Sequence, residues 1–229
     1  SKSALQDEVI YLVGRIFEIL NEYYGCQNWW PAENEFEIVV GSVLTQNTNW
    51  QNVEKSLNAL KRSGVMSPEK ILALSDVKLQ QLIYSSGFYR IKTKRLKAVC
   101  NLLVDRFDGQ VLNMKSTGLL RSRELLLGTN GIGPETADDI LLYAVGQPVF
   151  VVDTYSCRIF SRVGIGPSEH TYDVWQEFFM DNLPNDVGLF KQFHALIVRL
   201  GKEHCKSIPK CKGCPIYQYC SYPKKDYAE

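Results

Sequence analysis

The fold of this chain is decided by a stretch near its middle, which reads Leu126-Leu127-Gly128-Thr129-Asn130-Gly131-Ile132-Gly133-Pro134-Glu135-Thr136-Ala137. Helical periodicity precedes it over residues 119–127 and follows it over residues 134–145. Gly131 and Gly133 allow backbone dihedrals that other residues resist, so they permit a tight turn between these helices. Ile132 can plug the core, and Pro134 suits the first turn of the second helix. The stretch therefore predicts a helical hairpin over about residues 119–145.

The start of the second helix of this hairpin has a possible chemical use. Its first backbone amides lack partners within the helix, and such amides favour an anion. A hairpin of this kind can grip one DNA phosphate without reading the base sequence. An ordinary turn between two helices explains the same residues, and a Gly-x-Gly turn alone favours that simpler interpretation.

The remainder of the chain predicts an all-α protein of many short helices. Apolar residues recur with helical spacing, and strand patterns are rare. Ser67 before Pro68, and Ser75 before Asp76, are typical helix starts. The only β-like stretch, residues 148–152, is short enough to be a buried connector. The other predicted helices cover residues 7–24, 35–44, 52–61, 93–107, 154–163, 170–183 and 189–205.

Composition narrows the class of protein. The chain has 229 residues, 45% hydrophobic and 22% charged, so it can bury a core in one large domain or two small ones. No apolar run reaches the roughly 18 to 20 residues of a membrane span, and residues 1–8 show no signal-peptide pattern. We therefore expect a cytoplasmic protein with no membrane partner. A net charge of +1 excludes a globally basic DNA binder but permits a locally basic face.

The last part of the chain holds a cysteine cluster, spaced Cys205-x5-Cys211-x2-Cys214-x5-Cys220. Disulfides are a poor explanation in a reducing cytosol, so metal ligation is preferred. A [4Fe–4S] cluster takes four cysteines. A structural zinc also takes four, but usually as two tight C-x2-C pairs, whereas only one such pair is present here. The spacing therefore favours [4Fe–4S], with zinc and no metal as alternatives. We expect Cys26, Cys100 and Cys157 to be buried apolar fillers.

Two further segments place polar groups beside apolar runs. The run 147–152 delivers the carboxylate of Asp153 to a helix start, where an ordinary N-cap is the simplest interpretation. Residues 44–50 read Leu44-Thr45-Gln46-Asn47-Thr48-Asn49-Trp50, for which a helix end and loop are the simplest interpretation. Basic residues gather at Arg90, Lys92, Lys94, Arg95 and Lys97, and again at Lys206, Lys210 and Lys212. Solvated helix faces are the default for such runs, but beside a hairpin that grips a phosphate we expect at least some of these residues to contact DNA. We assign no role to His170 or His194, and a structural role to His204.

Taken together and in order, these motifs resemble the helix-hairpin-helix DNA glycosylases of the endonuclease III family. The resemblance covers nearly the whole chain. The hairpin, Val152-Asp153-Thr154 and the four cysteines follow one another as in that family. Residues 44–46 resemble the family's early helix, whose Gln enters the DNA stack, and residues 87–96 resemble the start of its middle helix.

The chain departs from the general pattern of this family at two places. Strand-cutting members keep a Lys at the position of Glu135, and a carboxylate cannot form the imine that this Lys forms, so we expect a monofunctional glycosylase. The first cysteine spacing is five residues here and usually six in the family. Residues 29–31, 45–50 and 131–138 resemble the endonuclease III-like 3-methyladenine glycosylases, in which the residues matching Trp30 and Trp50 face the flipped base.

The resemblance implies a fold and a set of roles. A barrel-like helical domain over residues 31–147 would end in the hairpin, and residues 1–30 with 148–229 would carry the cluster loop 205–220. The damaged base would lie in a cleft between Asp153 and Gln46. The implied roles are as follows: Asp153 is catalytic; Trp30, Trp50 and Glu135 line the lesion pocket, with the two indoles on opposite faces of the base; Gln46 is the DNA wedge; Gly131, Ile132 and Gly133 grip a phosphate.

The implied substrate is double-stranded DNA that contains an alkylated purine such as 3-methyladenine. The implied enzyme is a monomeric, DNA-associated prokaryotic protein of base excision repair that hydrolyses the N-glycosidic bond of this purine. A flipped cationic purine needs little help to leave, but it needs recognition, which stacking and cation–π attraction supply. Two alternatives stay open: a uracil or mismatch glycosylase on the same fold, and a non-catalytic four-cysteine DNA-binding module.

Overall fold

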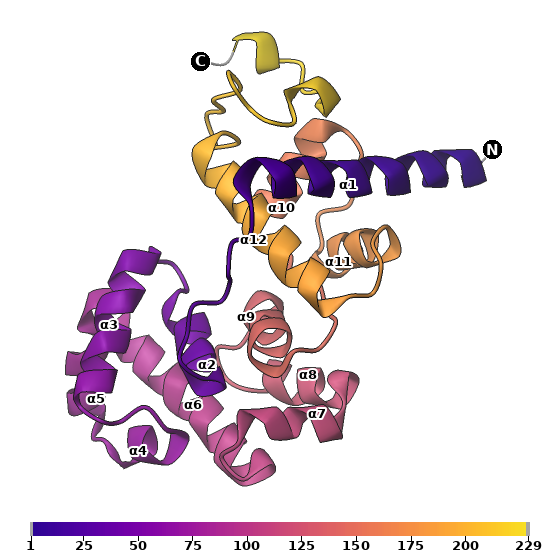
Figure 1. Ribbon diagram of the computed structural model, residues 1–229. Helices are drawn as coiled ribbons and strands as arrows, with labels where there is room; N and C mark the ends of the chain where they lie inside the picture. The colour runs from indigo at the N-terminus through magenta and orange to yellow at the C-terminus, as the bar shows by residue number, and fades with distance from the viewer. Residues whose placement is uncertain (1, 228–229) are drawn as a thin grey trace. The chain divides into compact units, whose positions relative to one another are not determined.

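The computed structural model describes residues 2–227, and their regular structure is entirely helical (Figure 1). The all-α prediction is confirmed for these residues, because none of them forms a strand. The run Val149–Val152 is buried and has no regular secondary structure. None of the helices in residues 2–227 combines the length and the apolar character that a membrane span requires.

The described residues divide into two compact units. One unit comprises the residues up to Trp29 and those from Pro148 onward; the other comprises Trp30–Gln147. The first contains α1 (Lys2–Tyr24), α10 (Thr154–Val163), α11 (Tyr172–Asp181), α12 (Val187–Glu203), η4 (Tyr217–Tyr219) and η5 (Lys225–Tyr227). The second contains α2 (Glu35–Leu44), α3 (Trp50–Arg62), α4 (Pro68–Ala73), α5 (Asp76–Ile83), η1 (Tyr84–Ser86), α6 (Tyr89–Phe107), η2 (Val111–Asn113), α7 (Met114–Thr117), α8 (Leu119–Leu127), α9 (Pro134–Asp139) and η3 (Ile140–Val145).

Three helix starts in the Trp30–Gln147 unit follow from side-chain caps. Asn34, Asn49 and Ser67 each accept a hydrogen bond from the backbone N–H three residues later, which satisfies an otherwise unpaired donor. The Asn49 cap starts α3 at Trp50, two residues before the predicted start at Asn52. Trp50 is therefore the first residue of a helix, and the first turn of α3 determines the position of its backbone.

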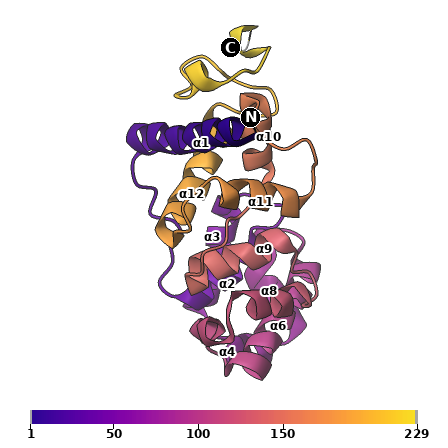
Figure 2. The same ribbon diagram turned by 90° about the vertical axis from the view of Figure 1, so that its right-hand side faces the viewer.

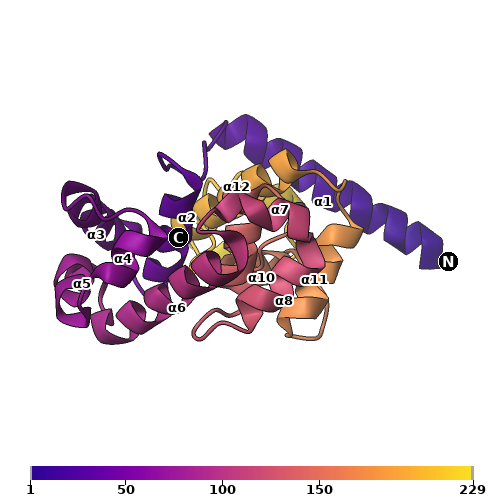
Figure 3. The ribbon, with the colours of Figure 1, turned by 90° about the horizontal axis from the view of Figure 1, so that it is seen from below.

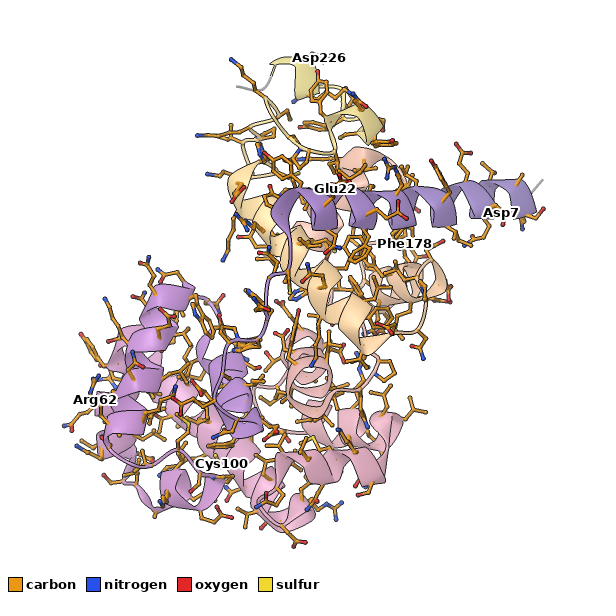
Figure 4. All side chains as sticks on the ribbon, viewed as in Figure 1. Asp7, Glu22, Arg62, Cys100, Phe178 and Asp226 are labelled. Atoms are coloured by element: carbon orange, nitrogen blue, oxygen red, sulfur yellow. The ribbon has the colours of Figure 1, made fainter. Side chains whose placement is uncertain are left out.

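The Trp30–Gln147 unit is built around α2 and α6. Helix α2 is buried from Phe36 to Leu44, as its continuous apolar sequence predicts, and packs against α3, α6 and η3. Helix α6 packs against α4 and α5 (Figure 3). The Cys100 side chain on α6 is fully buried among these helices (Figure 4), whereas Cys26 in the other unit is exposed, so the expectation of a buried filler is wrong for Cys26.

The second helix of the hairpin changes its winding partway. The sequence predicts one helix over residues 134–145, but the α-helix ends at Asp139 and continues as a π-helix over Ile140–Val145. All residues of this π segment are buried. Isolated π turns inside α-helices are found mainly at functional sites, where they shift the register of the side chains that follow.

The other unit packs α12 against α1 and α10 (Figures 1 and 2). Aromatic rings fill its centre. Phe150 stacks on Phe179 with ring centroids 4.4 Å apart, and Phe193 meets Phe150 edge-on. Phe178 on α11, labelled in Figure 4, contacts Phe160 on α10. These rings fix the short helices α10 and α11 relative to α12.

Candidate functional site

Asp153 is the N-cap residue of α10, directly after the buried run Val149–Val152. Its Oδ1 accepts the backbone N–H of Ser156 at 2.7 Å, and the Ser156 hydroxyl accepts the backbone N–H of Asp153 at 2.9 Å. This reciprocal pair is a capping box. It holds the carboxylate at the positive end of a helix dipole, where an anion is stabilised.

The second oxygen of this carboxylate faces a histidine. Oδ2 of Asp153 lies 3.1 Å from Nε2 of His194 on α12. The exposed fractions are 8% for the Asp153 side chain and 5% for that of His194. His194 has no predicted role, because its sequence separation of 41 from Asp153 leaves no local pattern that could pair the two. The one signal available was a polar residue inside the apolar run of α12.

The Asp153 carboxylate is an anion at neutral pH. Burial raises the pKa of Asp153, but the hydrogen bond and charge of His194 and the bonds from Ser156 outweigh burial and hold the pKa below its ordinary value. A carboxylate with a low pKa is a weak proton acceptor. The group is therefore better suited to stabilising a nearby positive charge than to removing a proton.

The predicted hairpin turn is present, and its two glycines differ. Gly131 has φ +79°, and a Cβ there would lie 2.2 Å from Cγ of Arg95, so only glycine fits. Gly133 has φ −87°, which any residue can adopt, so the expectation that it needs special dihedrals is wrong. Ile132 between them is 4% exposed and does plug the core.

Gln46, the predicted wedge, is hydrogen-bonded to this hairpin. Its Nε2 donates to the carbonyl of Gly131 at 3.1 Å and to Oγ1 of Thr136 at 3.0 Å. Arg95 on α6 donates to Oε1 of Gln46 at 2.7 Å. Gln46, Arg95 and the hairpin thus form one connected polar group within the Trp30–Gln147 unit.

Trp30 and Trp50 are half-buried and in contact. Their ring centroids are 5.3 Å apart and their planes meet at 79°, while Trp30 meets Tyr143 of the π segment at 5.7 Å and 61°. Two indoles on opposite faces of a base would be parallel and separated by two stacking distances. The expected sandwich is therefore absent from this structure, and the three rings form an edge-to-face group instead.

Glu135 is exposed in the first turn of α9, beside this hairpin. The position therefore presents a carboxylate and no amine. Gln46, Glu135, Trp30 and Trp50 all belong to the Trp30–Gln147 unit, and Asp153 belongs to the other.

The basic cluster at the start of α6 is largely engaged inside the protein. Lys92 is 1% exposed, and its Nζ donates to the carbonyls of Leu44 and Ser86, both at 2.7 Å. Burial and the neighbouring Arg95 lower the pKa of Lys92 to about 8. Lys97 pairs with Asp76 and with a backbone carbonyl. Only Arg90 and Lys94 of the cluster are exposed, so a DNA-binding role for Lys92 is ruled out by its burial.

The four clustered cysteines line a single cavity. Cys205, Cys211, Cys214 and Cys220 share it with apolar side chains such as Val163, Leu200 and Ile216. Among residues 2–227, no group of three or more His, Cys, Asp or Glu is gathered closely enough to ligate a single metal ion. The thiols thus surround a common space without meeting at one point. His204 bonds through Nδ1 to the Lys210 carbonyl at 2.8 Å, consistent with a structural role.

Arg162, at the end of α10, supports the cysteine loop. Its Nη1 donates to Sγ of Cys205 at 3.4 Å and to the Lys206 carbonyl at 2.7 Å, and its own carbonyl accepts from the Cys220 thiol. Burial raises the pKa of Cys205 and raises that of Cys214 to about 11. The guanidinium works in the opposite direction at Cys205, where it favours the thiolate.

Three known proteins are similar to this chain in sequence or in structure. A Methanocaldococcus jannaschii protein, MJ1434, whose name assigns it only provisionally as a DNA repair glycosylase, is 46% identical over 93% of this chain and 96% of its own length. The crystal structure of the H. pylori 3-methyladenine DNA glycosylase (MagIII), bound to 1,N6-ethenoadenine, is similar with a TM-score of 0.73 and 33% identity, covering 82% of this chain and 96% of that one. Endonuclease III in a non-covalent DNA complex shares the fold, with a TM-score of 0.79 and 23% identity over 95% of this chain and 98% of that one.

The family model of the HhH-GPD superfamily of base excision DNA repair proteins matches residues 40–185. This range contains the hairpin, Gln46 and Asp153. The expected likeness to endonuclease III is thereby confirmed, and an enzyme acting on DNA replaces the non-catalytic binding module. The chain belongs to the HhH-GPD superfamily, as an endonuclease III-like DNA glycosylase of base excision repair.

Proposed function

We propose that this glycosylase removes alkylated purines, with 3-methyladenine as the expected base, and that it hydrolyses the N-glycosidic bond without cutting the strand. The observation that carries the proposal is the Asp153 carboxylate, which is buried, doubly hydrogen-bonded and held as an anion. The carboxylate at Glu135 supports the monofunctional part, because no amine is present there to form an imine. The likeness to the H. pylori 3-methyladenine glycosylase supports the choice of base.

The chemistry suits a fixed anion. As the bond from C1′ to the purine nitrogen breaks, its electron pair leaves with the base and the sugar becomes oxocarbenium-like. A methylated purine is already cationic, so it departs as a neutral base without a general acid. Water then adds to C1′ and releases a proton to solvent. Asp153 stabilises the positive sugar electrostatically, which is the role its low pKa favours.

The aromatic group supports recognition of a cationic base. Trp30, Trp50 and Tyr143 offer ring faces whose negative quadrupoles attract a positive charge, which is worth about 0.5–2 kcal/mol per contact. Since the two indoles meet edge to face, the base would lie against one ring face and the edge of another. Glu135 would add negative charge at this pocket.

The DNA would be held by the connected group around the hairpin. In this proposal Gly131, Ile132 and Gly133 grip a phosphate, and Gln46 fills the space that the extruded base vacates. The hydrogen bond from Gln46 to the Gly131 carbonyl supports this arrangement, because it fixes the position of Gln46 relative to the phosphate-binding turn.

Product analysis tests the substrate. Duplex DNA carrying 3-methyladenine should yield the free base and an intact abasic strand, whereas uracil and mismatched bases should be released from DNA far more slowly. Sodium borohydride should trap no covalent protein–DNA adduct above the level of a catalytically inactive control. Preferred release of uracil or a mismatched base would replace the alkylpurine proposal, and efficient trapping would contradict the monofunctional one.

We also propose that Cys205, Cys211, Cys214 and Cys220 hold a [4Fe–4S] cluster. Four sulfur donors around one cavity fit the ligand set of that cluster, and Arg162 beside Cys205 supports the thiolate form. When bound, the cluster would supply a rigid inorganic centre that joins the ends of loop 205–220. Zinc on the same thiolates is the alternative.

Metal analysis separates the two. Protein purified without oxygen should contain about four iron atoms per chain, with little zinc. Cys214→Ala should lose the iron and destabilise the loop, because metal binding of this kind is coupled to folding. Cys26→Ala, which removes an exposed thiol that does not line the cavity, should keep the iron. Stoichiometric zinc without iron would decide for the alternative.

A further inference from the structure

The contact between His194 and Asp153 has so far been considered only for its effect on the charge of the carboxylate. We propose that His194 is a positioning residue, which donates a hydrogen bond from Nε2 to Oδ2 of Asp153 and so fixes the plane of this carboxylate for base excision. The inference rests on the proposed catalytic role of Asp153. It concerns orientation, since His194 acts through Asp153 and not on the DNA.

The geometry exceeds what a helix cap requires. An N-cap uses one side-chain acceptor, and Oδ1 of Asp153 fills that role through Ser156. Asp186 caps α12 in the same way, through the backbone N–H of Leu189 at 2.7 Å, and it is exposed. Asp153 differs because its second oxygen is also engaged, by a buried histidine from another helix.

Two hydrogen bonds from two helices fix the orientation of the Asp153 carboxylate, which one hydrogen bond would leave free to rotate. The terminal torsion of an Asp side chain is broad, so a single cap bond permits the carboxylate to rotate. Ser156 on α10 and His194 on α12 bind different oxygens and thereby define its plane. Each carboxylate oxygen has two lone-pair sites, so Oδ2 keeps one for a positive centre or a water molecule.

The direction of the hydrogen bond follows from the same chemistry. An ionised carboxylate only accepts, so the proton between the two groups belongs to Nε2 of His194. The ring itself is held in place: the residue is buried, and the rings of His194 and Trp29 meet edge to face with centroids 6.1 Å apart. His194 is therefore a rigid donor, which is what positioning requires.

The test compares donor and non-donor variants in the full-length protein. His194→Leu replaces the imidazole with an apolar side chain of similar size that has no donor, and His194→Gln restores an N–H near the position of Nε2. The single-turnover excision rate should fall on the order of 10²-fold in His194→Leu, since misplacing a reacting group by about 1 Å has that effect. The affinity for lesion DNA should change less than about twofold, because His194 acts on the chemical step. His194→Gln should recover most of the rate.

The controls keep the outcomes distinct. His170→Leu, at an exposed histidine, should leave rate and affinity unchanged. If His194→Leu does not fold, His194→Met takes its place. Equal rates for wild type and the non-donor variant would overturn the inference, and so would a His194→Gln variant as slow as His194→Leu, which would indicate packing alone. Asp153→Asn serves as the reference: if it stays active, the proposed role of Asp153 fails, whereas an inactive Asp153→Asn beside an active His194→Leu refutes only the positioning role. Rates are measured on whichever lesion the product analysis identifies.

Discussion

Asp153→Asn is expected to lower the single-turnover excision rate on the order of 10²- to 10³-fold while the protein stays folded and binds lesion DNA. The loss arises because a neutral amide cannot stabilise the positive sugar, and removing one preorganised electrostatic group has an effect of this size. The fold should survive because Asn is as good an N-cap as Asp, and its carbonyl can accept the Ser156 N–H.

Asp186→Asn is the matched control, since it makes the same change at the exposed cap of α12. It should leave the rate, the affinity and the melting temperature unaltered. Rates are measured with enzyme in excess over lesion DNA, and affinity by fluorescence anisotropy. Undiminished excision by Asp153→Asn would remove this carboxylate from the mechanism.

Arg123→Met is expected to cost about 3–5 kcal/mol of unfolding free energy, because it takes away one partner of a buried ion pair. Arg123 on α8 binds Asp138 on α9 through two nitrogens of its guanidinium, with Nε–Oδ1 at 2.8 Å and Nη2–Oδ2 at 3.0 Å. The Asp138 side chain is fully buried. Methionine keeps the aliphatic packing of Arg123 but leaves the Asp138 charge without its guanidinium. The pair joins the two helices of the hairpin, so DNA affinity should fall together with stability.

Arg121→Met, on the same helix, provides the comparison. Its partner Glu124 is in an exposed pair, with side chains 50% and 70% accessible, and such pairs contribute about 0–1 kcal/mol. Urea unfolding of the two variants should therefore separate them by several kcal/mol. Similar midpoints for both would show that the buried pair contributes no more than an exposed one.

Local patterns predicted the elements that have local causes. Helix α10 runs over Thr154–Val163, as its cap and the glycine after it indicate, and α2 was identified by its continuous apolar sequence. The π segment at the end of the hairpin was missed, because an apolar run has the same composition in either winding. The start of α3 at Trp50 depended on the Asn49 cap, which a run of several polar residues obscured.

The candidate site shows the same division. Asp153 was found because an apolar run delivers a carboxylate to a helix start, and the four cysteines because their spacing is compact. His194 could not be found in this way, since its contact with Asp153 depends on how α12 packs against α10. The angle between Trp30 and Trp50 was also out of reach, because it is set by the packing of side chains from α3 and from the segment before α2.

The fate of the cations on α6 bears on how DNA binding responds to salt. A cation that neutralises a DNA phosphate releases about 0.9 counterion, so each one steepens the fall of affinity with ionic strength. The five cations between Arg90 and Lys97 would, from the sequence alone, be expected to add strongly to this salt dependence. Lys92 is committed to backbone carbonyls, Arg95 to Gln46 and Lys97 to Asp76. Within this segment, only Arg90 and Lys94 can therefore add to the salt dependence of DNA affinity. The other positive charges stabilise the protein internally and should contribute little to that dependence.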